Sequence, residues 1–125
     1  MRSIRGSLVN LQPLIPVSIG VFDAPLHQRV TVQALIDTGA TRTCITTTLI
    51  DQLGLQPRGK MLVAGATSYP ERRRAYGYSI GFYCDDQAAQ HQTLYVLPHE
   101  FIAPSFRRTA ISRCFWAWTS CRGVD

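Results

Sequence analysis

The sequence predicts a mainly β domain with one short helix. Apolar and small residues alternate with period two in several stretches, most clearly over 16–22 and 74–82, as they do in half-buried strands. Turn-forming residues separate these stretches, and the segment 47–53 has apolar residues on one helical face. The 125 residues suffice for one domain with a buried core.

The first two strands are expected to form a hairpin. Residues 16–22 alternate, Asp23-Ala24-Pro25 supplies a turn, and 29–36 returns as the second strand. Cys44-Ile45 is then expected to form a short buried strand. A helix should follow over 47–53, because Thr46 suits the N-cap position and Gly54 stands just beyond the end.

A second hairpin is expected over 60–69 and 74–82, with a tip of small residues between its strands. The segment 71–74 should lie on an exposed turn or strand edge, where arginine deters unwanted strand pairing. Residues 85–90 are expected to form a polar turn before a strand over 92–97. Asp85 and Asp86 should be solvated, because adjacent residues of this kind point apart and make a poor acid-base pair or metal site.

The most informative stretch is 34–40, in which three apolar residues run into a carboxylate. A carboxylate seldom ends a core strand without a reason. Gly39 allows a tight turn, and Thr38 offers a hydroxyl that can bond locally or across an interface. Asp37 is therefore predicted to be a catalytic acid held on a rigid element, with simple capping of the turn as the alternative.

The string Leu35-Ile36-Asp37-Thr38-Gly39-Ala40 resembles the active-site signature of the retropepsin-like aspartic proteases, single-domain relatives of pepsin that work as homodimers. The flanking sequence agrees from about Pro13 to Pro98. The resemblance implies an acid-protease closed barrel or sheet, with Asp37 catalytic and Thr38, Gly39 and Ala40 forming the active-site turn. It also implies a flap that closes over the substrate, with contacts expected at Val63, Ala64, Gly65, Ala66 and Thr67.

The implied reaction is hydrolysis of a peptide bond by water activated between two Asp carboxylates, one from each subunit of a homodimer. Such a reaction needs a peptide or protein substrate and no metal or other cofactor. The expected organisation is an N-terminal extension over 1–12, an incomplete protease domain over 13–104 and an atypical tail over 105–125. A non-catalytic dimerisation or peptide-binding module, or a disrupted gene product, is the alternative. A phosphatase with Asp37 as nucleophile is disfavoured, because no second Asp follows two residues later.

The tail departs from the family, which next needs an apolar strand and a Leu-Gly-x-Asp segment. If codons are formed from the third base of each residue and the first two of the next, the stretch from Arg113 to Thr119 reads apolar-apolar-Leu-Gly-apolar-Asp, whichever synonymous codons are used. A fixed Leu, Gly and Asp in register would arise by chance on the order of once in a few thousand trials. We therefore hypothesise a frameshift between about Pro98 and Arg113, so that residues from roughly Ser105 onward are not evolved to fold here.

Composition argues against several other classes of function. The net charge of +5 invites a nucleic-acid interpretation, but the arginines are scattered apart from Arg72-Arg73-Arg74, and no aromatic-interleaved motif or zinc-finger spacing accompanies them. No membrane partner is expected either, because no run approaches the roughly 20 apolar residues that span a bilayer. The four cysteines contain no Cys-x-x-Cys pair, which favours reduced thiols in a cytoplasmic protein and no metal site.

Overall fold

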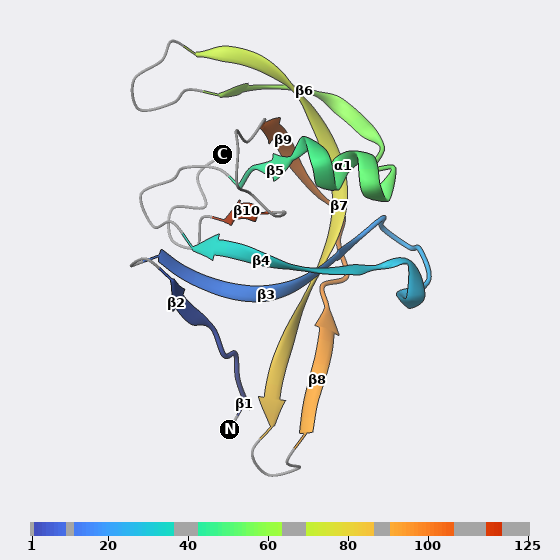
Figure 1. Ribbon diagram of the computed structural model, residues 1–125. Coiled ribbons are helices and arrows are strands. Elements are labelled where there is room, and N and C mark those ends of the chain that lie inside the picture. The colour runs from blue at the N-terminus through green and yellow to red at the C-terminus, as the bar shows by residue number, and fades with distance from the viewer. Residues whose placement is uncertain are drawn as a thin grey trace.

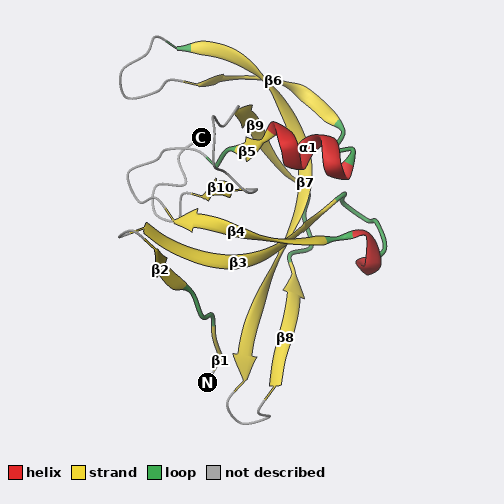
Figure 2. Cartoon of the chain, in the orientation of Figure 1, coloured by secondary structure: helices red, strands yellow, loops and turns green. Residues whose placement is uncertain are grey.

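The computed structural model describes residues 2–9, 12–36, 43–63, 70–86, 91–106 and 115–118. Figures 1 and 2 show a molecule built mainly of strands with one short α-helix, as the sequence predicts. The strands are β1 (Arg2–Ser3), β2 (Ser7–Val9), β3 (Gln12–Gly20), β4 (Val30–Ile36), β5 (Ile45–Thr46), β6 (Pro57–Val63), β7 (Glu71–Asp86), β8 (His91–Val96), β9 (Phe101–Phe106) and β10 (Phe115–Trp118). The helix α1 spans Thr47–Leu53, and a 3-10 turn, η1, spans Leu26–Gln28.

The long strand β7 organises the sheet. It pairs antiparallel with β1, β3, β6, β8 and β9 along different parts of its length. The main strand order is β10-β4-β3-β7-β9-β5, and within the described residues this path does not close into a barrel. The expected acid-protease closed barrel or sheet is therefore present as an open sheet.

The first hairpin is confirmed, with shifted limits. β3 begins at Gln12 and ends at Gly20, and β4 runs antiparallel to it in the register Leu14↔Leu35 to Ile19↔Val30. Val17 and Ile19 are fully buried in β3, because their side chains point from one face of the strand into the core. Asp23 has a φ of 66°, which fits the expected turn after this strand.

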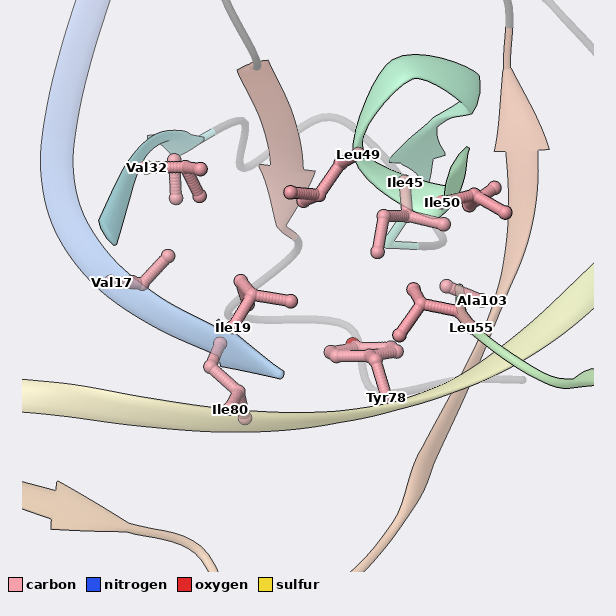
Figure 3. Close-up of a cluster of buried hydrophobic side chains, with 11 residues drawn as sticks. Val17, Ile19, Val32, Ile45, Leu49, Ile50, Leu55, Tyr78, Ile80 and Ala103 are labelled. Atoms are coloured by element: carbon pink, nitrogen blue, oxygen red, sulfur yellow. The ribbon is translucent and has the colours of Figure 1, made fainter. Parts of the chain in front are cut away.

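The core lies between the β3–β4 hairpin, β7 and α1 (Figure 3). Tyr78 and Ile80 of β7 contribute to it, as do Ala34 of β4 and Leu49 of α1. The other buried members of the cluster are Val17, Ile19, Val32, Ile45, Ile50, Leu55 and Ala103. One continuous cluster therefore joins the strand that precedes Asp37 to the elements that follow it.

The helix α1 matches its predicted limits. The Thr46 side chain accepts a hydrogen bond from the backbone N–H of Leu49 at 3.3 Å, as an N-cap does. Gly54 adopts a left-handed conformation with φ 66°, and its N–H donates to the carbonyl of Ile50 at 2.9 Å. Leu49 and Ile50 are buried, so the predicted apolar face does pack on the core.

A single arginine ties two strands together on the face of the sheet away from this core. The Arg29 guanidinium donates to the hydroxyl groups of Ser18 and Ser79, each at 2.8 Å. It also donates to their backbone carbonyls at 2.8 and 3.2 Å. Both serines are almost completely buried, and burial lowers the pKa of Arg29 while nearby Tyr83 raises it. This side chain thus covers polar groups that β3 and β7 would otherwise leave without partners.

One local expectation was confirmed and one was wrong. Residues 71–74 belong to β7, are mostly exposed and pair on one side with β6, so they lie on an exposed strand edge as expected. Asp85 and Asp86 are not part of a polar turn, because they also belong to β7. The Asp85 carboxylate is not solvated either: its side chain is 20% exposed and lies 2.7 Å from the Arg5 guanidinium. A contact distant in sequence therefore decides the environment of Asp85.

The extremes of the chain also join the sheet. β1 and β2 lie within the expected extension 1–12 and pair with β7 and β3, respectively. β9 pairs with β7 and lies parallel to β5, and β10 lies parallel to β4. The residues on either side of β10, 107–114 and 119–125, lie outside the described part of the chain. The frameshift therefore stays a hypothesis about the gene.

Candidate active site

The predicted catalytic turn itself lies outside the described residues. This applies to Asp37, Thr38, Gly39 and Ala40 alike. The structure does describe both ends from which the turn is held, namely Ile36 at the end of β4 and Thr43 where the chain resumes. The elements on either side of the predicted turn define where the candidate site lies.

The strand that leads into the turn is paired on both edges. β3 lies on one side, with Leu14 opposite Leu35, and β10 lies on the other, with Trp118 opposite Ile36 (Figure 1). Ala34 is fully buried, and Leu35 and Ile36 are half-buried. A strand paired on both sides as far as its last residue but one is a rigid base, which is what a catalytic carboxylate needs.

The chain that leaves the turn is fixed by a buried tyrosine. Tyr78 is 3% exposed, and burial raises the pKa of its hydroxyl above the usual range. A side-chain hydrogen bond with Thr43 acts in the opposite direction, while nearby Cys44 adds to the increase. Tyr78 therefore stays protonated at neutral pH and links β7 to the first described residue after the turn.

Sequence analysis did not single out Tyr78. The available signal was its place in the alternating stretch 74–82, on the same face as Ile80. A buried tyrosine usually finds a hydrogen-bond partner for its hydroxyl, but the identity of that partner depends on the tertiary fold.

The next residues after Thr43 and Cys44 are anchored still more firmly. Ile45 and Thr46 are buried, and β5 lies parallel to β9 with Ile45 opposite Ser105. Thr46 then caps α1, so strand, cap and helix follow without an intervening loop. The chain is consequently held on both sides of the predicted turn, by β4 before it and by β5 and α1 after it.

The predicted flap is partly described. Val63 is the last residue of β6, while Ala64, Gly65, Ala66 and Thr67 lie outside the described residues. β6 and β7 pair antiparallel from Val63↔Glu71 to Lys60↔Arg74, with an irregularity between Pro57 and Lys60. In Figure 1 the hairpin forms an arm. The end of β6 and the start of β7 lie on the same side of the molecule as the end of β4.

A separate hollow lies at the other end of β4. It has a volume of about 450 Å³ and lies between the β3–β4 connection and the residues after β8. Its lining includes Arg29 together with apolar side chains such as Phe22, Leu26 and Leu97. Because it adjoins the start of β4 and Asp37 follows the end, this hollow is not part of the candidate active site.

Two other kinds of site have no candidate among the described residues. No group of three or more His, Cys, Asp or Glu side chains in that part of the chain could hold a metal ion. Nor does any helix there have the length and apolar character needed to cross a membrane.

Comparison with known proteins identifies a family. A family model described as aspartyl protease matches residues 17–102, which includes β4, the predicted catalytic turn, α1 and the β6–β7 hairpin. Comparisons with curated proteins and with solved structures find no match.

Proposed function

The chain belongs to the aspartyl protease family, and we propose that it is an aspartic endopeptidase that acts as a homodimer through Asp37. The observation that carries the proposal is the Asp37-Thr38-Gly39 sequence directly after β4, a strand paired on both edges. The family match covers this segment. A carboxylate directly after such a strand would be held by the sheet, and the small residues that follow it in the sequence would allow a turn.

The proposal of a second subunit is supported by the number of Asp-Thr-Gly sequences in these 125 residues. The chain contains one Asp-Thr-Gly sequence, whereas the proposed chemistry uses two carboxyl groups. A twofold axis beside the turn would bring Asp37 of each subunit together. Thr38 is proposed to stabilise the paired turns through its hydroxyl, and Gly39 and Ala40 leave room for the close approach.

Two carboxylates at such short range cannot both ionise easily, so they share one proton and titrate as a coupled pair. The ionised member accepts a proton from a bound water as the water oxygen attacks the peptide carbonyl carbon. The protonated member donates its proton to the carbonyl oxygen, which gives a neutral tetrahedral intermediate. Proton transfer to the amide nitrogen then allows the C–N bond to break. The protein's own carboxyl groups complete this cycle.

The β6–β7 hairpin is proposed to act as the flap. Val63, Ala64, Gly65, Ala66 and Thr67 would contact the peptide backbone and help to exclude water from the reacting bond. This assignment is supported by the position of Val63 at the end of a paired strand and by the small residues that follow it.

A peptidase assay of Asp37→Asn against the parent chain tests the proposal. Removing the acid should lower turnover by at least about 10²–10⁴-fold, the usual contribution of a positioned acid or base. Asp51→Asn is the matched control, because Asp51 is an exposed residue of α1 and its change removes the same charge. Pepstatin-sensitive cleavage that survives in Asp37→Asn would refute the assignment.

A non-catalytic dimerisation or peptide-binding module remains the second candidate. It is favoured by the sequence of β10, which replaces the expected Leu-Gly-x-Asp segment beside the catalytic strand. Assaying the chain as written beside a chain with the frame restored separates the two. Cleavage only by the restored chain would assign this product to a protease lineage without activity of its own.

A further inference from the structure

The β6–β7 hairpin has two faces of different character. Direct cross-strand neighbours share a face, so Lys60 lies with Arg74 and Leu62 with Arg72 on one side. These four residues, called here the cationic strip, are all exposed, and Leu62 is 57% exposed. The other face carries Arg73, which contacts Glu71 at 2.6 Å and the Ser105 carbonyl at 3.3 Å.

Alternation along β7 gives the cationic strip the same parity as residues that pack in the core farther along the strand. Arg72 and Arg74 have the same parity as Tyr78 and Ile80, whose side chains point into the core (Figure 3). The register irregularity in this hairpin falls in β6, so the alternation of β7 is continuous. Val32 of β4 lies in the same core cluster. The strip therefore continues, at the exposed end of β7, the strand face that farther along packs in one cluster with Val32 of β4.

The charges of the strip are not balanced within the described part of the protein. No carboxylate there lies within ion-pairing distance of Lys60, Arg72 or Arg74, whereas Arg58 pairs with Glu100 and Arg73 with Glu71. Lys60 and Arg74 stand directly opposite each other, and like charges in that arrangement destabilise a strand pair. An anion bound over the strip would relieve this repulsion.

We propose that the cationic strip selects peptide substrates with acidic side chains at alternate positions beside the cleaved bond. Arg72 and Arg74 are two residues apart in a strand, a separation of about 6.5–7 Å. Alternate side chains of an extended peptide have the same separation, so two of its carboxylates can face the two guanidinium groups. Leu62 adds an apolar contact beside them. This proposal rests on the proposed protease function and assigns that site a substrate class.

The test compares two fluorescent peptides with the same apolar centre, flanked at alternate positions by Glu in one and by Lys in the other. Binding to the full chain is measured by anisotropy and cleavage by chromatography. The Glu peptide should bind about fivefold more tightly than the Lys peptide at low salt. This ratio corresponds to the summed binding free energy expected for two exposed ion pairs. The preference should shrink at about 0.5 M salt, because exposed charges are then screened.

Charge reversal provides the decisive variant. Arg72→Glu with Arg74→Glu should reverse the preference toward the Lys peptide, and Glu at position 74 would face Lys60 as a favourable opposite pair. Arg5→Gln is the control for loss of a positive charge elsewhere, because Arg5 pairs with Asp85 far along β7 from the hairpin. It should leave the preference unchanged.

Several results would overturn the charge selection: equal binding of the two peptides, binding of neither, or a preference that survives the reversal. Competition by a single-stranded oligonucleotide as strong as that of the Glu peptide would point to a nucleic acid instead. Equal cleavage of both peptides that depends on Asp37 would refute the selection and leave the protease proposal intact. Charge-dependent binding without cleavage would support the selection and count against the enzyme.

Discussion

Replacing Arg29 with leucine should destabilise the fold without touching the candidate active site. The substitution leaves the hydroxyl groups of Ser18 and Ser79, which are 1% and 2% exposed as residues, without their donor. The two carbonyls that also accept from Arg29 lie in paired strands, so the loss of these two hydrogen bonds should cost less free energy. A buried polar group without a partner costs roughly 1–3 kcal/mol, and the two hydroxyls together give an expected loss of about 3 kcal/mol.

This loss can be measured by urea unfolding followed by circular dichroism. For a domain of this size about 3 kcal/mol corresponds to a decrease in Tm of roughly 10 °C. The triple variant Arg29→Leu, Ser18→Ala, Ser79→Ala is the control, because it removes donor and acceptors together and should recover part of the stability. The reasoning is refuted if Arg29→Leu changes the free energy of unfolding by less than about 0.5 kcal/mol, or if the triple variant is less stable than the sum of its parts.

The remaining predictions concern the supports of the turn. Tyr78→Phe removes the hydrogen bond with Thr43, so the free energy of unfolding at neutral pH should fall by about 1 kcal/mol. Folding raises the pKa of Tyr78, so the folded protein holds this proton more tightly than the unfolded chain does. The stability of the parent protein should therefore fall as the pH rises above about 10. In Tyr78→Phe this fall should be smaller. A pH series of urea unfolding curves checks both, and identical slopes would contradict the argument. Thr46→Ala should cost about 1 kcal/mol by removing the N-cap of α1, with Thr47→Ala, one residue into the helix, as the comparison. Gly54→Ala should cost about 1 kcal/mol through its left-handed φ, and a thermal melt unchanged within error would contradict this.

Local signals were sufficient to predict the helix. The hydroxyl of Thr46 and the left-handed Gly54 act on neighbouring backbone groups, so the residue types alone indicate where the helix begins and ends. The strand before Asp37 was predictable for a similar reason, since its apolar run ends at a turn sequence. The resemblance to aspartic proteases, which the family comparison confirms, depended on the same short stretch.

Features that depend on distant partners could not be predicted in this way. β7 extends to Asp86 because β1 and β8 pair with its far half, and neither pairing leaves a signature in the sequence of β7 itself. The ion pair of Asp85 with Arg5 and the contact of Tyr78 with Thr43 arise from the same kind of nonlocal meeting. The hydrogen bonds of Arg29 also depend on the tertiary fold, because Ser18 and Ser79 come from different strands.

The pairing of β10 with β4 has a consequence for synthesis on the ribosome. β4 emerges early, but the neighbour that covers its outer edge is translated long afterwards. Until then the edge next to Asp37 offers unpaired backbone groups to any passing strand, including one from another nascent copy. β4 therefore gains its second neighbour only after most of the other elements have been made, and its open edge is exposed to misassembly for that interval.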